Sequence, residues 1–182
     1  MLRHIDIMIA AVLTAIIFIK MVKVMQMFKV RIYIETSLKG FRKQTGWYGA
    51  VIEFIKKNGE PETRDIFEKV EATANQIMII ALTQSLTQLT KECEVTVYIA
   101  SEYVRSSIEK DRIRQWKMNG WNTARNEPVA NVEEWQQLEP LLQKHKVIFS
   151  YKKTNGYKEW LLNEIQKRKD DCEKWEQQRL LQ

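Results

Sequence analysis

The sequence predicts a mixed α/β fold in which a single sheet is flanked by helices. Two observations carry this prediction. Three strand-like segments follow one another early in the chain, and helix-like and strand-like segments then alternate to its end. A third observation agrees, since 6 Gly and 3 Pro among 182 residues favour long regular elements with short connections. With 45% hydrophobic and 29% charged residues, a chain of this length suffices for one globular domain with its own core.

Three strands are expected first. Residues 30–37 (VRIYIETS) alternate between apolar and polar side chains and include β-branched and aromatic residues, and residues 47–56 (WYGAVIEFIK) are also strand-like. Asn58 and Gly59 both tolerate positive φ, which favours a hairpin turn. Residues 63–70 are therefore predicted to return as a third strand, antiparallel to the second.

The period of the hydrophobic pattern changes after the third strand. Between Thr73 and Thr90 the apolar residues recur every three to four positions, which predicts a helix with one buried face. Residues 94–99 (EVTVYI) are predicted to form a fourth strand. A helix should follow it directly, with Ser101 as its N-cap.

Two more helices are expected around a fifth strand. Asn131 is the predicted N-cap of the first, whose opening turn contains Glu133 and Glu134. Residues 146–151 are predicted to form the fifth strand, and residues 158–181 a charged C-terminal helix.

The N-terminal segment, residues 1–28, differs from this pattern. Residues 7–19 contain no charge, but a spanning helix needs roughly 20 apolar residues, and no small-residue cleavage site follows. Three interpretations stay open: a membrane anchor whose flanking Lys20 and Lys23 reach the interface, an additional helix on the domain, or a misassigned start upstream of a true initiator such as Met27. Membrane contact is expected only through residues 1–28.

Cysteine content and charge narrow the class of protein. Two cysteines, Cys93 and Cys172, exclude a disulfide framework, and no Cys/His cluster has the spacing of a zinc site. A cytoplasmic location is expected, or a membrane-anchored one if the N-terminal segment is genuine. The net charge of +6 divides into +3 for residues 1–29 and +3 for residues 30–182, so the body of the protein is nearly balanced.

One local cluster departs from this balance. Between Arg105 and Arg125, six basic residues accompany only Glu109 and Asp111, and Trp116 lies among them. A solvated helix face is the simplest interpretation, and a phosphate-binding surface is the alternative.

Two segments resemble type 1 ribonuclease H. Residues 90–109 (TKECEVTVYIASEYVRSSIE) are similar to its central strand and following helix. The second segment is more specific, because ten residues match the family pattern without a gap: Trp116, Gly120, Trp121, Thr123, Ala124, Pro128, Val129, Asn131, Trp135 and Leu138.

This resemblance implies an RNase H-like fold, a five-stranded mixed sheet with three antiparallel strands and then two parallel ones, flanked by helices. The domain would span residues 29–167. Residues 1–28 would form an extra apolar N-terminal helix, and residues 168–182 would extend the charged C-terminal helix.

The catalytic positions are where the chain departs from this family. Ribonuclease H cleaves the RNA strand of an RNA–DNA hybrid with two Mg²⁺ ions held by four acidic residues. The resemblance implies that Glu35 retains the first acid position, whereas Met78, Ala100 and Lys167 replace the other three. Residues 153–156 align with the family's histidine loop and contain no histidine. Because Mg²⁺ requires hard oxygen ligands, Glu35 alone is not expected to be competent, and no cofactor is expected.

The residues with which this family grips nucleic acid are better retained. Thr73 and Asn75 match the segment that contacts the RNA strand. Trp116, Thr123 and Ala124 match residues that line the channel for the DNA strand. The family's basic protrusion corresponds to Arg112, Arg114, Lys117 and Arg125.

Three functions therefore stay open at the level of sequence. The first is a catalytically degenerate RNase H-like protein that binds RNA–DNA hybrid or other duplex nucleic acid without hydrolysis. The second is an RNase H-fold domain that binds a protein partner, which the nearly balanced charge favours. The third is a hybrid ribonuclease with a rearranged metal site, and only this function would require Mg²⁺.

Overall fold

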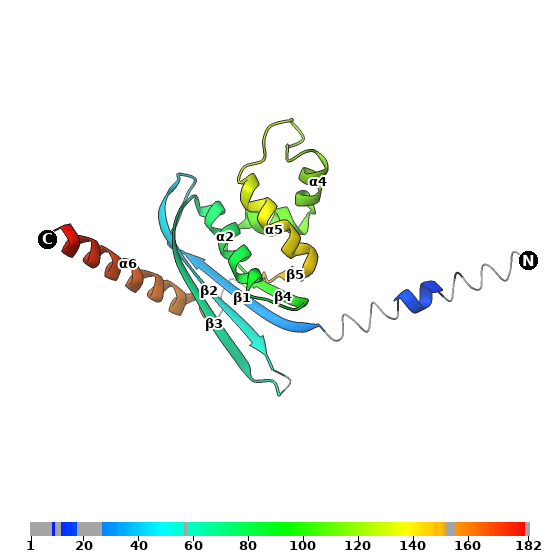
Figure 1. The fold of residues 1–182 in the computed structure, drawn as a ribbon, viewed down its shortest axis with the longest axis horizontal. Coiled ribbons are helices and arrows are strands. Elements are labelled where there is room, and N and C mark those ends of the chain that lie inside the picture. Colours follow the sequence, from blue (N-terminus) through cyan, green and yellow to red (C-terminus); the bar gives the residue numbers. More distant parts are fainter. Residues whose placement is uncertain (1–8, 10–11, 18–26, 57, 152–155, 181–182) are drawn as a thin grey trace, which may run out of the picture.

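A five-stranded mixed sheet forms the centre of the molecule (Figure 1). The structure is a computed structural model that describes residues 9, 12–17, 27–56, 58–151 and 156–180. The strands are β1 (Phe28–Thr36), β2 (Gln44–Ile55), β3 (Pro61–Ala72), β4 (Cys93–Tyr98) and β5 (Lys146–Phe149). Their order is β3-β2-β1-β4-β5, with β1–β3 antiparallel and β4 and β5 parallel to β1. The predicted sheet is confirmed.

Buried apolar side chains on the three central strands, β2, β1 and β4, set the register of the sheet. Ile32 on β1 lies opposite Ile52 on β2 and Val97 on β4, and all three are at most 5% exposed. A shift by one residue would turn these side chains toward the opposite face.

Helices cover both faces of the sheet. They are α2 (Ala74–Thr87), α3 (Glu102–Glu109), α4 (Arg112–Met118), α5 (Val132–Lys144) and α6 (Lys158–Leu180). The main core lies between the sheet and α2 and α5, where Trp135 and Leu138 are fully buried. On the other face, Leu161 of α6 packs against Tyr33 and Val51.

The two predicted N-cap residues, Ser101 and Asn131, stand at the starts of their helices, and Thr73 is a further N-cap that was not predicted. Thr73 caps α2 in a capping box with Gln76, and Ser101 accepts a hydrogen bond from the backbone N–H of Val104 as the N-cap of α3. Asn131 stands at the predicted N-cap position of α5. Its backbone is left-handed, with φ 59°, and its side chain makes no capping bond. Asparagine is favoured there because it tolerates positive φ.

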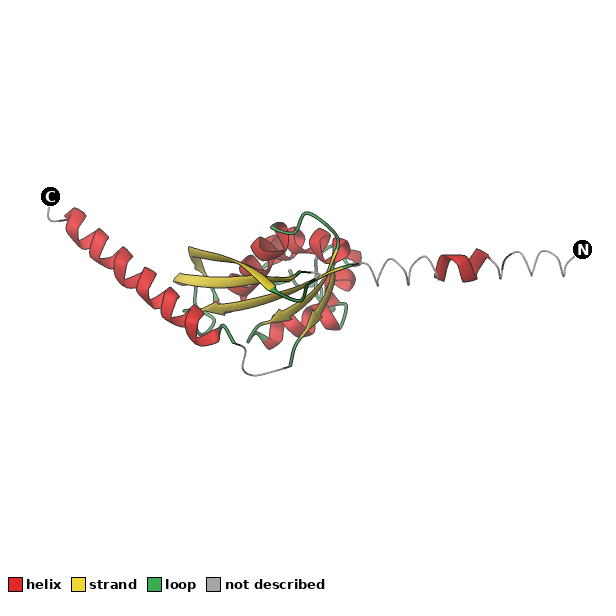
Figure 2. Ribbon diagram, turned by 90° about the horizontal axis from the view of Figure 1, so that it is seen from below, coloured by secondary structure: helices red, strands yellow, loops and turns green. Residues whose placement is uncertain are grey.

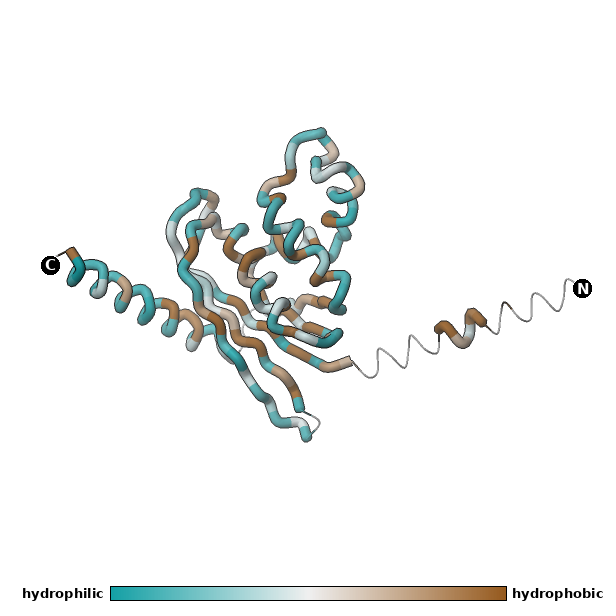
Figure 3. Tube along the Cα trace, viewed as in Figure 1, coloured by the Kyte–Doolittle hydropathy of each residue, from teal (hydrophilic) through white to brown (hydrophobic). Residues whose placement is uncertain are grey.

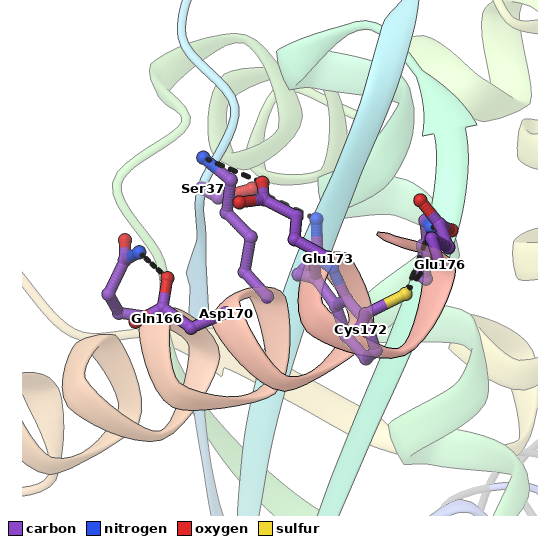
Figure 4. Close-up of polar contacts among 9 residues, drawn as sticks. Ser37, Gln166, Asp170, Cys172, Glu173 and Glu176 are labelled. Atoms are coloured by element: carbon purple, nitrogen blue, oxygen red, sulfur yellow. Dashed lines mark hydrogen bonds and ion pairs between the residues drawn. The ribbon is translucent and has the colours of Figure 1, made fainter. Parts of the chain in front are cut away.

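α6 is one continuous helix that extends past the strands (Figure 2). It runs without a break across the boundary expected at residues 167 and 168. Figure 4 shows its outer half, where Cys172 and Glu176 face β3. Lys69 Nζ of β3 lies 2.8 Å from Glu176 Oε1 and 3.2 Å from Cys172 Sγ, so this half is also attached to the sheet.

Within the N-terminal segment, residues 12–17 are helical, and Val12, Leu13 and Ile17 are each more than half exposed. The rest of residues 1–26, apart from Ile9, lies outside the described part of the chain. No helix among the described residues is both long enough and apolar enough to span a bilayer. The three interpretations of this segment stay predictions.

Candidate nucleic-acid interface

The ends of β1 and β4 bring the first and third acid positions together. These strands are parallel neighbours, and Tyr33 pairs with Tyr98 at the end of their ladder. Glu35, on β1, and Ala100, in the bend after β4, each stand two residues beyond that pair, and the two strands are about 4.8 Å apart. The start of α2 lies at the same edge, because Ser101 Oγ donates to Asn75 Oδ1 at 2.9 Å. One sheet edge thus collects Glu35, Ala100 and Asn75.

Glu35 faces α6 across this edge. Burial raises the pKa of its carboxyl, and the positive charge of Lys158 opposes that rise. Lys158 is the first residue of α6. Lys167, the expected replacement of the fourth acid, lies nine residues further along the helix, about 13 Å away at 1.5 Å per residue. Lys158 is therefore the residue of α6 whose charge acts on Glu35, and Lys167 as the replacement of the fourth acid stays a prediction.

A buried hydrogen-bond network holds the start of α6 in this position. Tyr157 donates to Glu53 Oε2 at 3.0 Å, and Arg31 donates to Glu53 Oε1 at 2.8 Å. Glu53 is 6% exposed, and the Tyr157 ring packs 4.8 Å from that of Tyr33. Burial, and then the charge of Glu53, raise the pKa of Tyr33 to about 12. This network fixes Lys158, the next residue, beside the end of β1.

The positions of the second and third acids provide no metal ligand. Met78 is 4% exposed and packs within the main core, and Ala100 is exposed but has no oxygen in its side chain. The described residues contain no group of three or more His, Cys, Asp or Glu side chains that could hold a metal ion. The positive charge of Lys158 also acts on Glu35, and a positive charge there opposes the binding of a cation. The residues present do not fit two Mg²⁺ ions.

Thr73 and Asn75 are held in place at the start of α2. The Thr73 hydroxyl accepts from the backbone N–H of Gln76 at 3.2 Å, so it is already used as a cap. The Asn75 side chain contacts Ser101 and so ties α2 to the start of α3. Gln76 also donates to Glu134 of α5 at 2.6 Å. The first turn of α2 is therefore a rigid, half-exposed surface beside Glu35.

The basic cluster forms a protruding arm, here called the basic handle and defined as residues 111–131. It consists of α4 and the loop that follows, and Figure 1 shows this arm beyond α5. α3 ends and α4 begins around Asp111, whose backbone is left-handed with φ 52°. Trp116 anchors the arm, because its ring packs 5.7 Å from that of Trp135 in the core. The sequence did not separate α4 from α3.

The charges of the basic handle differ in availability. Lys117 Nζ lies 2.8 Å from Glu139 Oε1, so its charge is partly neutralised, and Arg114 is 3.9 Å from Asp111 with 75% of its side chain exposed. Arg112 and Arg125 have no ion pair among the described residues, and Arg125 is exposed in the loop.

The loop around Arg125 has a defined shape. The Thr123 hydroxyl accepts from the backbone N–H groups of Arg125 and Glu127, both at 3.3 Å. Ala124 is exposed in the same loop. Thr123 and Ala124 thus present Arg125 to solvent on a fixed turn.

A second basic element, the loop between β1 and β2, was not predicted from the sequence. This basic–aromatic loop, residues 38–43 (LKGFRK), contains Lys39, Arg42 and Lys43 around Phe41, which is 89% exposed. The signal was present as an aromatic residue among cations in a turn, a pattern typical of nucleic-acid contacts. Figure 1 shows this loop beside the start of α2, on the same side of the sheet as the basic handle.

Comparisons with known proteins agree with this architecture. The sequence model of RNase H matches residues 28–158. Ribonuclease H of Nitratidesulfovibrio vulgaris (strain DP4) is 35% identical over 128 residues, which cover 70% of this chain and 78% of that protein.

Two solved structures share the fold. The crystal structure of LC9-RNase H1, a type 1 RNase H with the type 2 active-site motif, aligns with a TM-score of 0.59 at 17% identity, over 71% of this chain and 65% of that one. A foamy viral protease–reverse transcriptase in complex with RNA/DNA hybrid aligns with a TM-score of 0.53 at 14% identity, over 68% of this chain and 17% of that one. At these identities the two structures indicate the fold alone.

Proposed function

The chain belongs to the ribonuclease H family, and we propose that it is a member that binds RNA–DNA hybrid or other duplex nucleic acid without hydrolysing it. The observation that carries this proposal is the state of the acid positions. Glu35 is the only carboxylate among them, Met78 is buried in the core, and Lys158 supplies a positive charge. Two-metal hydrolysis requires a cluster of carboxylates that this edge lacks.

The retained surface favours nucleic acid as the partner. The first turn of α2 and the basic handle lie on one side of the sheet, and the handle presents Arg112, Arg114 and Arg125 with little internal neutralisation. Contacts of this kind to phosphates give affinity that does not depend on base sequence. The foamy viral relative was solved with an RNA/DNA hybrid, which makes a hybrid the first ligand to test.

Lys158 gives a reason why binding would not need a metal. An ammonium group beside Glu35 supplies positive charge at the edge where this family places Mg²⁺. Phosphate oxygens approaching this edge would meet Lys158 and the positive end of the α2 dipole. We therefore expect equal affinity with Mg²⁺ and with a chelator present.

Binding and cleavage of one labelled hybrid, measured together on the full chain, test this proposal. We expect saturable binding with no cleavage in Mg²⁺, Mn²⁺ or a chelator. Turnover that depends on metal and is abolished by Glu35→Ala would instead establish the rearranged nuclease. Absence of binding to hybrid, double-stranded RNA and double-stranded DNA would leave the protein-interaction domain as the function.

The contribution of the basic handle is measured by salt dependence. The slope of log binding constant against log salt concentration becomes more negative by roughly 0.9 for each phosphate contact. Arg114→Gln combined with Arg125→Gln should therefore make this slope less steep by about two units. Lys169→Gln with Lys174→Gln, on the outer part of α6, removes the same charge elsewhere and should leave the slope nearly unchanged. Equal slopes for both double variants would show that the handle is not the contact surface.

A further inference from the structure

We propose that the basic–aromatic loop is a second contact site, on which Phe41 stacks with an unpaired base of a single-stranded extension while Lys39, Arg42 and Lys43 hold the adjacent phosphates. This inference rests on the proposed function and deepens it, because it assigns a preference for hybrids or duplexes that carry a single-stranded tail. Phe41 is 89% exposed, so its ring is available for contact with a ligand.

The loop is firmly anchored, so the exposure of Phe41 does not result from a loose segment. Leu38 is 7% exposed and packs against Gly46, where an added Cβ would lie 2.2 Å from its Cγ. The backbone N–H of Leu38 donates to Thr36 Oγ1 at 3.1 Å, and that of Ala74 in α2 donates to Gly40 O at 3.3 Å. The base of the loop is thereby fixed to β1, β2 and α2.

Gly40 shapes the turn that presents the ring. Its φ is +90°, a conformation that residues with a Cβ rarely adopt, and no atom lies within 4 Å of where a Cβ would be. The glycine is therefore required by the backbone and not by packing. This turn places Phe41 immediately after the point at which the loop is attached to α2.

The charges around Phe41 are free to bind an anion. Among the described residues, Lys39, Arg42 and Lys43 form no ion pair, unlike Lys117 of the basic handle. Three unneutralised cations beside an exposed ring combine the two features with which proteins bind single strands, namely electrostatic contact with the backbone and stacking with the bases.

The chemistry of stacking specifies an unpaired base. Inside a duplex, both faces of each base are covered by neighbouring pairs, so a phenyl ring has no free face to contact. A single-stranded tail exposes these faces. The basic handle and the loop lie on the same side of the sheet (Figure 1), so a duplex held by the handle could extend its tail toward Phe41.

The test compares three ligands with the full chain: a blunt hybrid, the same hybrid with a tail of about ten nucleotides, and vesicles of anionic lipid. We expect the parent to prefer the tailed hybrid, and Phe41→Ala to weaken that binding about tenfold while changing the blunt hybrid less than about threefold. Phe41→Trp should retain the preference. Leu180→Ala, which removes an apolar side chain that is 87% exposed on α6, is the matched control and should change neither affinity.

Each remaining outcome separates this inference from the proposed function. Binding of both hybrids with equal affinity by the parent and Phe41→Ala would overturn the stacking site and leave the proposed function intact. Binding of the tailed hybrid alone, lost in Phe41→Ala, would support the stacking site and overturn duplex binding. Binding to vesicles in place of nucleic acid, with loss in Phe41→Ala, would overturn both and assign the loop to a membrane surface.

Discussion

Met78→Glu and Ala100→Asp should change the free energy of unfolding by different amounts, because Met78 is buried and Ala100 is exposed. Met78 is 4% exposed within the core, whereas Ala100 is exposed at the end of β4. Met78→Glu removes a buried apolar side chain, worth about 1.5–3 kcal/mol, and buries a carboxyl group, which costs about 1–3 kcal/mol more. We therefore expect the free energy of unfolding to fall by about 2.5–6 kcal/mol. Ala100→Asp should change it by less than about 0.5 kcal/mol.

The pH dependence identifies the cause of this loss. Burial should raise the pKa of the new carboxyl above its unfolded value, so the folded state would hold a proton that the unfolded state releases. Stability would then decrease as pH rises through the folded-state pKa, and it would recover toward low pH. Met78→Gln is the matched control, because it is close in size and polarity but does not titrate.

Urea unfolding at several pH values, with and without Mg²⁺, measures these effects. In Met78→Glu/Ala100→Asp, added Mg²⁺ should restore part of the stability, by about 1.4 kcal/mol at a concentration ten times the Kd. If Met78→Glu unfolds at the same urea concentration as the parent at pH 7, its side chain does not enter the core. The reasoning that the second acid position has become a packing position would then be refuted.

Three further predictions concern buried groups. His145 is 3% exposed, and its Nδ1 accepts a hydrogen bond from the backbone N–H of Cys93 at 3.3 Å. Because burial lowers the pKa of His145, the free energy of unfolding should fall as pH drops below about 6.5. His145→Gln should remove this pH dependence in urea unfolding between pH 5 and 8. Burial raises the pKa of Glu35, so the charged form costs stability at neutral pH, and Glu35→Gln should be at least as stable as the parent at pH 7 in thermal unfolding; a clear loss would reveal a stabilising ionic role. Gly49→Ala should destabilise by about 1–3 kcal/mol, because its Cβ would lie 2.5 Å from the Phe67 ring, and a melting temperature within about 1 °C of the parent would contradict this packing.

The strands could be predicted from sequence because β1, β2 and β4 are rich in buried β-branched and aromatic residues, and β4 alternates strictly between buried and partly exposed positions. The hairpin between β2 and β3 followed from Asn58 and Gly59, and the cap of α3 followed from Ser101, since both depend on local chemistry alone. Asn131 stands at the predicted N-cap position of α5, but its left-handed backbone and the lack of a side-chain capping bond were not evident from the sequence.

The candidate site was predicted less completely, because it depends on contacts between distant segments. The sequence did not indicate that the charge of Lys158 acts on Glu35, because this depends on how α6 packs on the sheet. The side chains of α6 alone do not define this register. It is set by Tyr157, whose hydrogen bond to Glu53 spans 104 residues.

The outer strand β3 determines whether two copies of the protein can pair through the edges of their sheets. It is a twelve-residue edge strand, and beyond β2 its backbone has no partner strand among the described residues. Figure 3 shows that this strand is largely hydrophilic. Six of its residues are charged: Glu62, Arg64, Asp65, Glu68, Lys69 and Glu71.

An unpaired strand of this length would otherwise recruit a second sheet, above all where molecules are crowded side by side along a polymer. On β3, four carboxylates face two cations, so two copies meeting edge to edge would bring an excess of like charge into contact. Under the proposed function, the same charges would let neighbouring copies occupy adjacent stretches of one nucleic acid without pairing through β3.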